Sequence, residues 1–202
     1  MQTHDMNHFF ALRAEKQQHI IDAALAVFGK NGYKKASVAD IATMAGIAKG
    51  MVAYYFGCKR GLYLYLANHC GKIVMNGLSS VQLCDDFFER IKTITAAKIN
   101  MMKRHPAIFA FLTRLYYETD PEVAEDVAAF RQHSTTSRQS MLYAEADTSK
   151  LKPGIDPALL DKFLTWAGQG MAEDLLSNME RVDEYTSEFF RLLDIMKLHF
   201  TH

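Results

Sequence analysis

Glycine and proline are distributed unevenly along this chain of 202 residues, and this distribution restricts its fold more than any other feature. Eight of the eleven glycines fall between Gly29 and Gly77, whereas all four prolines lie beyond residue 100. Clustered glycines indicate tight turns between short elements, and the later prolines suit the first positions or the ends of longer helices. Because no useful stretch alternates apolar and polar residues as a strand does, we predict an all-α fold. Longer helices are expected over roughly 59–82, 85–104, 106–118, 121–147, 156–179 and 182–200.

The glycine-rich part predicts a pair of short helices. Residues 37–40, Ser-Val-Ala-Asp, have the form of a capping box, in which the hydroxyl and the carboxylate each satisfy a free backbone N–H group. This box opens a helix that Gly46 closes, and a second short helix is expected over about 48–56. Such a pair is typical of a helix-turn-helix, although two packing helices without a DNA role would give the same pattern. A longer amphipathic helix precedes the pair, indicated by the spacing of Ile21, Ala24, Leu25 and Phe28.

A more specific set of residues runs from Ile20 to Tyr63 without a gap. It comprises Ala23-Ala24, Phe28, Gly32-Tyr33, Val38, Ile41-Ala42, Ala45-Gly46-Ile47, Lys49-Gly50, Tyr54-Tyr55-Phe56, Lys59 and Leu62-Tyr63. This order and spacing resemble the N-terminal domain of TetR-family (tetracycline-repressor-like) transcriptional regulators. The resemblance implies an all-α homodimer of about nine helices per chain. It implies a three-helix helix-turn-helix DNA-binding domain over residues 1–60 and a helical ligand-binding and dimerisation domain over 61–202.

The resemblance also assigns contacts to a double-stranded DNA operator. Lysine supplies a charge to phosphate or guanine acceptors, a phenolic hydroxyl donates to phosphate oxygens, and a glycine lets the backbone approach the groove closely. Base edges would be faced by Lys49, Gly50 and Met51, and phosphates would be held by Ser37, Tyr54, Tyr55 and Lys59.

The sequence departs from the family pattern at Ala48, Met51, Ala53 and Cys58, and three of these changes remove possible hydroxyl donors. Base reading is therefore expected to depend on Lys49 and on apolar contact with thymine methyl groups. Two alternatives stay open. One tyrosine of the pair in the second short helix could be mainly a packing residue, and the lysine that follows the pair could be merely solvated.

The charge balance differs between the two expected domains. The whole chain has 23 Lys plus Arg and 23 Asp plus Glu, and a net charge of zero taken alone argues against nucleic-acid binding. Residues 1–60, however, contain eight Lys or Arg against four Asp or Glu. A basic N-terminal part on an acidic remainder gives modest support to phosphate binding by one end of the chain.

The larger domain contains residue types suited to a small-molecule pocket, in which apolar, aromatic and methionine side chains surround a few polar groups. Most of these residues could equally be ordinary core. The candidates for contact with an inducer are Met101, Phe109, Leu112, Tyr116, Tyr117, Phe130, His133 and Trp166.

Small residues inside the helix expected over 156–179 indicate a close approach by another helix or by a ligand. Glycine there costs roughly 1 kcal/mol relative to alanine, a cost that close packing can offset. Since the resemblance implies that the last two long helices form the dimer interface, we prefer helix packing. The predicted interface comprises Leu164, Ala167, Met171 and Leu175, with Phe189, Leu192, Leu193 and Met196 on the final helix.

Other function classes receive less support from the sequence. No apolar run approaches the roughly 18 residues of a membrane span, and we expect a cytoplasmic protein without a membrane partner. Its three cysteines, Cys58, Cys70 and Cys84, form no Cys-x-x-Cys pair, and no metal site or cofactor is indicated. The leading hypothesis is a repressor released by a small-molecule inducer. A regulator controlled by a protein partner is the alternative, and a helical small-molecule-binding protein or enzyme is a weaker one.

Overall fold

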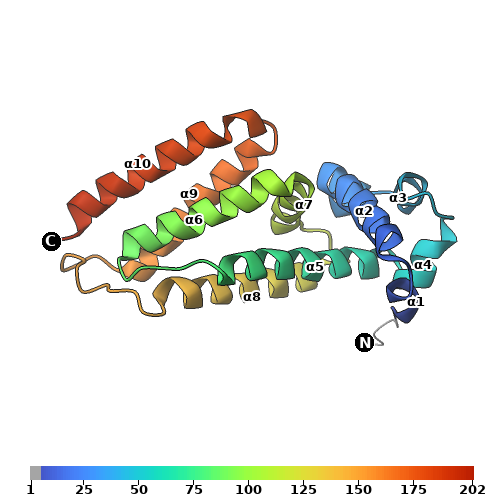
Figure 1. Ribbon diagram of the computed structural model, residues 1–202, viewed down its shortest axis with the longest axis horizontal. Coiled ribbons are helices and arrows are strands. Elements are labelled where there is room, and N and C mark those ends of the chain that lie inside the picture. Colours follow the sequence, from blue (N-terminus) through green and yellow to red (C-terminus); the bar gives the residue numbers. More distant parts are fainter. Residues whose placement is uncertain (1–5) are drawn as a thin grey trace. The chain divides into compact units, whose positions relative to one another are not determined.

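The computed structural model describes residues 6–202, and in this part of the chain it is entirely helical apart from turns and isolated β-bridges (Figure 1). The predicted all-α fold is confirmed. No helix among the described residues is long and apolar enough to cross a membrane. The elements are α1 (Asn7–Phe10), α2 (Ala14–Lys35), α3 (Val38–Met44), α4 (Gly50–Phe56), α5 (Lys59–Ser79), α6 (Phe87–Arg104), α7 (Pro106–Tyr116), α8 (Ala124–Tyr143), α9 (Pro157–Leu175), the 3-10 helix η1 (Met179–Arg181) and α10 (Val182–Phe200).

Proline and local polar side chains fix several helix starts. Pro106 and Pro157 occupy the first turns of α7 and α9, where the missing N–H costs nothing. Asp156 caps α9 by accepting a hydrogen bond from the N–H of Ala158 at 2.8 Å. α8 begins three residues after Pro121, because residues 121–123 form a turn. The prolines thus lie at or just before helix starts, as their chemistry requires.

The chain divides into two compact units, each with its own core. The first contains the chain up to Ile73 together with residues 105–134, and the second contains 74–104 and 135–202. The boundary that the sequence predicts at residue 60 divides the expected DNA-binding part from the expected ligand-binding part. The two compact units instead group the residues that pack together. The helix-turn-helix accordingly shares its compact unit with α7 and the first part of α8.

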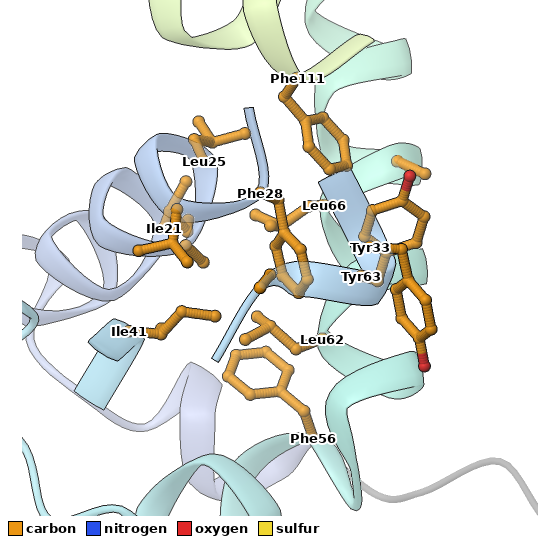
Figure 2. Packing of buried hydrophobic residues seen from close by; sticks show 14 of the residues in the cluster. Ile21, Leu25, Phe28, Tyr33, Ile41, Phe56, Leu62, Tyr63, Leu66 and Phe111 are labelled. Carbon is orange, nitrogen blue, oxygen red and sulfur yellow. The ribbon is translucent and has the colours of Figure 1, made fainter. Parts of the chain in front are cut away.

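The core of the first unit is rich in stacked and edge-on aromatic rings (Figure 2). The ring of Tyr63 lies 4.9 Å from that of Tyr33, 5.0 Å from that of Phe28 and 5.3 Å from that of Phe111, centroid to centroid. α7 approaches α2 closely at Gly29, where an added Cβ would lie 3.3 Å from Ala110. This packing gives α2 a rigid support on the side away from α3 and α4.

The core of the second unit is formed by α6, α9 and α10 and by the ends of α5 and α8. Its buried members include Phe88, Leu142, Leu164 and Leu193. The charged side chains of Arg90 and Asp161 are both buried in this unit, and Arg90 donates to the carbonyls of Cys84 at 2.8 Å and Met141 at 3.0 Å and also to that of Ala144. Arg90 therefore holds the C-terminal end of α8, whose last carbonyls lack helical partners.

Candidate nucleic-acid interface

The first helix of the predicted pair begins at a serine cap. Ser37 has extended backbone angles, and its hydroxyl accepts hydrogen bonds from the N–H groups of Ala39 at 3.2 Å and Asp40 at 3.4 Å. The reciprocal bond of a full capping box, from the Ser37 N–H to the Asp40 carboxylate, is not formed among the described residues. Ser37 thus sets where α3 starts, and its hydroxyl is already engaged with two backbone donors.

The turn between α3 and α4 has the geometry of a Schellman motif. Gly46 has a φ of 65°, the left-handed region that glycine adopts without cost. The N–H of Ile47 donates to the carbonyl of Ala42 at 3.0 Å, and the N–H of Gly46 donates to that of Thr43 at 3.2 Å. Ile47 packs against the core of the first unit. This turn fixes the direction in which the second helix leaves the first.

α4 separates its side chains into an inner and an outer face. Val52, Tyr55 and Phe56 are buried in the core, with at most 4% of each residue exposed. Lys49, Gly50, Ala53 and Tyr54 are exposed, and Tyr54 retains 48% of its surface. The outer face therefore carries a charge, an uncovered backbone and a phenol, the chemistry expected of a helix that contacts DNA.

Two residues predicted to contact DNA lie on the inner side of α4. Tyr55 is 4% exposed and belongs to the aromatic core, so it is the packing residue of the tyrosine pair. Met51 is half-buried against the same core. The reason is helical geometry, since residues 51, 52, 55 and 56 follow the i, i+1, i+4, i+5 spacing of one helix face. The burial of Tyr55 favours the alternative in which one tyrosine of the pair is mainly a packing residue, and the contact predicted for Met51 stays a prediction.

Gly50 lies beside open space among the described residues 6–202. It lies outside the left-handed region, and a Cβ added to it would meet no atom within 4 Å. A glycine in a helix costs about 0.5–1 kcal/mol relative to alanine, so a packing or functional reason is expected for it. Because this space is open, close packing against another described residue does not explain why a glycine is present here. Close approach of a partner molecule would explain it.

The short helix α1 extends the outer face of α4, which the sequence analysis did not foresee. Phe9 is fully buried and lies against the rings of Phe56 and Tyr65, at 4.8 and 5.3 Å between centroids. This anchor stacks the exposed ring of His8 on that of Tyr54 at 4.6 Å. The apolar pair Phe9-Phe10 in a polar start was the available signal, but a four-residue helix is too short to be read from periodicity.

Lys59 lies at the start of α5 and is held against the end of α2. Its ammonium donates to the carbonyl of Lys34 at 3.3 Å and lies 4.4 Å from the centroid of the Tyr33 ring. Burial and the nearby Glu122 raise the pKa of Tyr33, so this ring remains neutral. Glu118 accepts a hydrogen bond from the Tyr33 N–H at 2.8 Å. Lys59 is therefore a positioned cation rather than a freely moving one, and two of its three N–H donors remain for other acceptors.

Comparison with known proteins identifies this helical arrangement. Residues 20–66, which run from the middle of α2 into α5, match the model of the family described as bacterial regulatory proteins, tetR family. This part of the chain therefore has the DNA-binding domain of the TetR family. The HTH-type transcriptional regulator BetI of Yersinia pestis (strain Pestoides F) is 34% identical over 74 residues. That match covers 35% of the chain, and the chain spans only 37% of the length of BetI.

Solved structures share the fold over nearly the whole chain. A TetR family transcriptional regulator from Chloroflexus aurantiacus superimposes with a TM-score of 0.77 at 22% identity, covering 96% of this chain and 97% of that one. The transcriptional regulator FadR from Bacillus subtilis, solved in complex with stearoyl-CoA, gives a TM-score of 0.70 at 17% identity, covering 87% and 96%. At these identities the two structures establish a common TetR-like fold.

The residues predicted to contact an inducer are divided between the two compact units. Leu112 and Phe130 pack against the core of the first unit, whereas Met101 packs against that of the second. His133 is exposed, and Trp166 is 57% exposed. These candidates share residue types but not a helix face, so they include both core and surface residues. The remaining candidates, Phe109, Tyr116 and Tyr117, lie along α7 and at its C-terminal cap, and Tyr117 lines a surface depression of about 330 Å³ with Lys30, Lys35 and Arg114.

The predicted dimer stripe lies mostly on the inner side of its helices. Leu164, Leu193 and Met196 belong to the core of the second unit, and Leu175 is fully buried. Ala167, Met171 and Phe189 are half-buried, and only Leu192 of the eight is exposed. The four buried residues, Leu164, Leu175, Leu193 and Met196, pack inside their own chain and are not available to a second copy, whereas the assignment of the other four stays a prediction. The large apolar residues that α9 and α10 leave exposed are Leu159, Phe163 and Trp166, and Leu192, Ile195 and Leu198.

Proposed function

We propose that this chain is a sequence-specific DNA-binding transcriptional regulator, a repressor that a small-molecule inducer releases from its operator. The outer face of α4 is the observation that carries the proposal. It combines Lys49 with a glycine that none of the described residues approaches, on a helix whose inner face packs into an aromatic core. A rigid helix presenting its first turn outward suits entry into a major groove.

We assign different roles to the residues around this face. Lys49 reads base edges through guanine acceptors, and Gly50 allows the backbone to lie close to the groove floor. Tyr54 and Lys59 bind phosphates, as does the Ser37 end of α3. His8, stacked on Tyr54, orients that phenol. Tyr55 supports the face from behind and makes no contact of its own.

We propose that two chains associate through the exposed apolar faces of α9 and α10. Leu159, Phe163 and Trp166 are each at least 50% exposed in the single chain, as Leu198 is on α10. Large apolar patches of this kind mark association sites. A two-fold dimer would present its two recognition helices to major grooves about 34–36 Å apart, which gives the operator two half-sites.

The inducer acts by binding one conformation of the dimer better than the other, so that the separation of the recognition helices no longer matches the operator. The complex of FadR from Bacillus subtilis with stearoyl-CoA supports a small-molecule ligand for a chain of this fold. Control by a protein partner is the alternative, and the absence of any ligand-dependent change in operator affinity would favour it. The match to the tetR family model supports a regulatory role over catalysis.

Footprinting tests this proposal. The full-length chain is added to a duplex taken from the region upstream of its own gene, and hydroxyl-radical cleavage is mapped on both strands. We expect two protected segments on one face of the duplex, centred about 10 base pairs or a multiple of that apart. Protection that is uniform along the duplex, or equal on an unrelated duplex, would contradict sequence-specific binding by a dimer.

A further inference from the structure

A group of charged and polar side chains lies inside the second unit, away from the DNA-binding face. Arg138 of α8 donates to the Asp161 carboxylate of α9 at 2.6 Å and to the Thr165 hydroxyl of the same helix at 2.6 Å. Only 1% of Asp161 is exposed, and its second oxygen, Oδ1, is buried without a hydrogen-bond partner. A buried carboxylate oxygen without a donor is costly, and Arg138 is the partner that offsets part of this cost for Asp161.

A second cation from a different helix belongs to the same group. Lys98 of α6 is close enough to interact electrostatically with both Arg138 and Asp161, yet it forms no ion pair with any described carboxylate. Desolvation, reinforced by Arg138 and opposed by Asp161, lowers its pKa to about 8. The Tyr143 hydroxyl donates a hydrogen bond to the Pro157 carbonyl at 2.8 Å. Burial raises the pKa of Tyr143 to about 12, so this side chain contributes no charge. Two cations therefore face one carboxylate, and one positive charge is left over.

Apolar side chains lie on the same helix faces as the charged residues of this group. Residues three positions apart share one face of a helix. Met101 follows Lys98 at this spacing, Met141 follows Arg138 and Leu164 follows Asp161. Leu164 belongs to the core of the second unit, and the two methionines pack against that core. Two of these are methionines, whose unbranched side chains repack readily around a ligand. Gly77 of α5 leaves Met101 space, because a Cβ at that position would collide with the methionine sulfur.

We infer that Lys98 and Arg138 bind the carboxylate of an amphipathic inducer, whose apolar part lies among Met101, Met141 and Leu164. Asp161 holds Arg138 in place, and Lys98 supplies the charge that no residue of the chain neutralises. One excess charge matches a carboxylate better than a phosphate ester, which carries about −1.5 to −2 at pH 7. The inference rests on the proposed function for its consequence, release of DNA, but the binding site is a property of the chain alone.

Calorimetric titration tests the site with decanoate as the probe and decan-1-ol, which has the same chain without the charge, as its matched control. The variant that decides is Lys98→Met, since this lysine has no ion pair whose loss would unfold the chain. Arg138→Met would leave the buried Asp161 carboxylate without its ion-pair partner. This variant is less informative because the loss would destabilise the fold. The control variant is Lys103→Met, on the same helix but exposed and paired with Asp183. Each variant is first checked for native helix content by circular dichroism.

We expect decanoate to bind the unmodified chain at least tenfold more tightly than decan-1-ol does. Lys98→Met should weaken decanoate at least tenfold and leave decan-1-ol unchanged, whereas Lys103→Met should alter neither. Absence of decanoate binding, or equal binding by the Lys98 variant, overturns the inference. Operator binding is measured separately without decanoate. A chain that binds operator but not decanoate refutes this site alone, and a chain that binds decanoate but no operator refutes the proposed regulatory function.

Discussion

Replacing Gly50 with alanine should raise the stability of the chain while weakening its binding to DNA. The glycine lies outside the left-handed region at the start of α4, and an added methyl group meets no atom within 4 Å. Because Gly50 is the first residue of α4 rather than an interior one, alanine should stabilise the helix by no more than about 0.5 kcal/mol. For a chain of this length that corresponds to a rise in Tm of no more than about 2 °C. The same methyl group would lie between α4 and the floor of the groove, and we expect operator affinity to fall more than tenfold.

Gly46 supplies the contrasting control in the same motif. Its φ of 65° is strained for alanine, so Gly46→Ala should lower the free energy of unfolding by about 1–2 kcal/mol. Thermal unfolding followed by circular dichroism measures stability, and fluorescence anisotropy with a labelled operator duplex measures affinity. The reasoning is refuted if Gly50→Ala binds operator as well as the unmodified chain does, or if it destabilises the fold.

Three further predictions concern other parts of the chain. Lys59→Ala should weaken binding about equally across DNA sequences and reduce the slope of log affinity against log salt by roughly one, whereas Lys49→Ala should change which sequences are preferred, as binding titrations on a set of duplexes would show. Trp166→Glu should convert a dimer into a folded monomer in analytical ultracentrifugation, because it places a charge on the exposed face of α9; an unchanged dimer would exclude that face. Burial lowers the pKa of Lys98 to about 8, below its ordinary value, so between these values the unfolded chain retains a proton that the folded chain has released. Stability should therefore rise with pH from about 8 to 10 relative to that of Lys98→Met in urea titrations, and parallel curves would show that Lys98 is not desolvated.

The DNA-binding domain could be predicted from sequence because local chemistry determines it. Ser37 accepts backbone donors at the start of α3, and Gly46 takes the left-handed conformation that ends it. Both effects depend on neighbours within a few residues, so they are visible in the sequence itself. The same holds for Pro106 and Pro157, which mark the starts of α7 and α9.

The proposed dimer face and the proposed ligand site could not be predicted in the same way, because they depend on which side of a helix meets the rest of the chain. On α9 the stripe containing Leu164 and the stripe containing Phe163 are both apolar, and they differ by one residue. Only tertiary packing shows that the first is buried and the second exposed. The proximity of Lys98 to Asp161, 63 residues away in sequence, leaves no local signature either.

Competition binding tests the central claim, that the outer face of α4 reads DNA sequence, most directly. The full-length chain is bound to a labelled duplex from the region upstream of its own gene, at fixed salt, and displaced by unlabelled copies of that duplex or of a scrambled one. We predict that the upstream duplex competes at least about 10³-fold more effectively than the scrambled duplex, the lower bound for specific DNA binding. We also predict that Gly50→Ala removes most of this difference. Equal competition by the two duplexes would contradict the account.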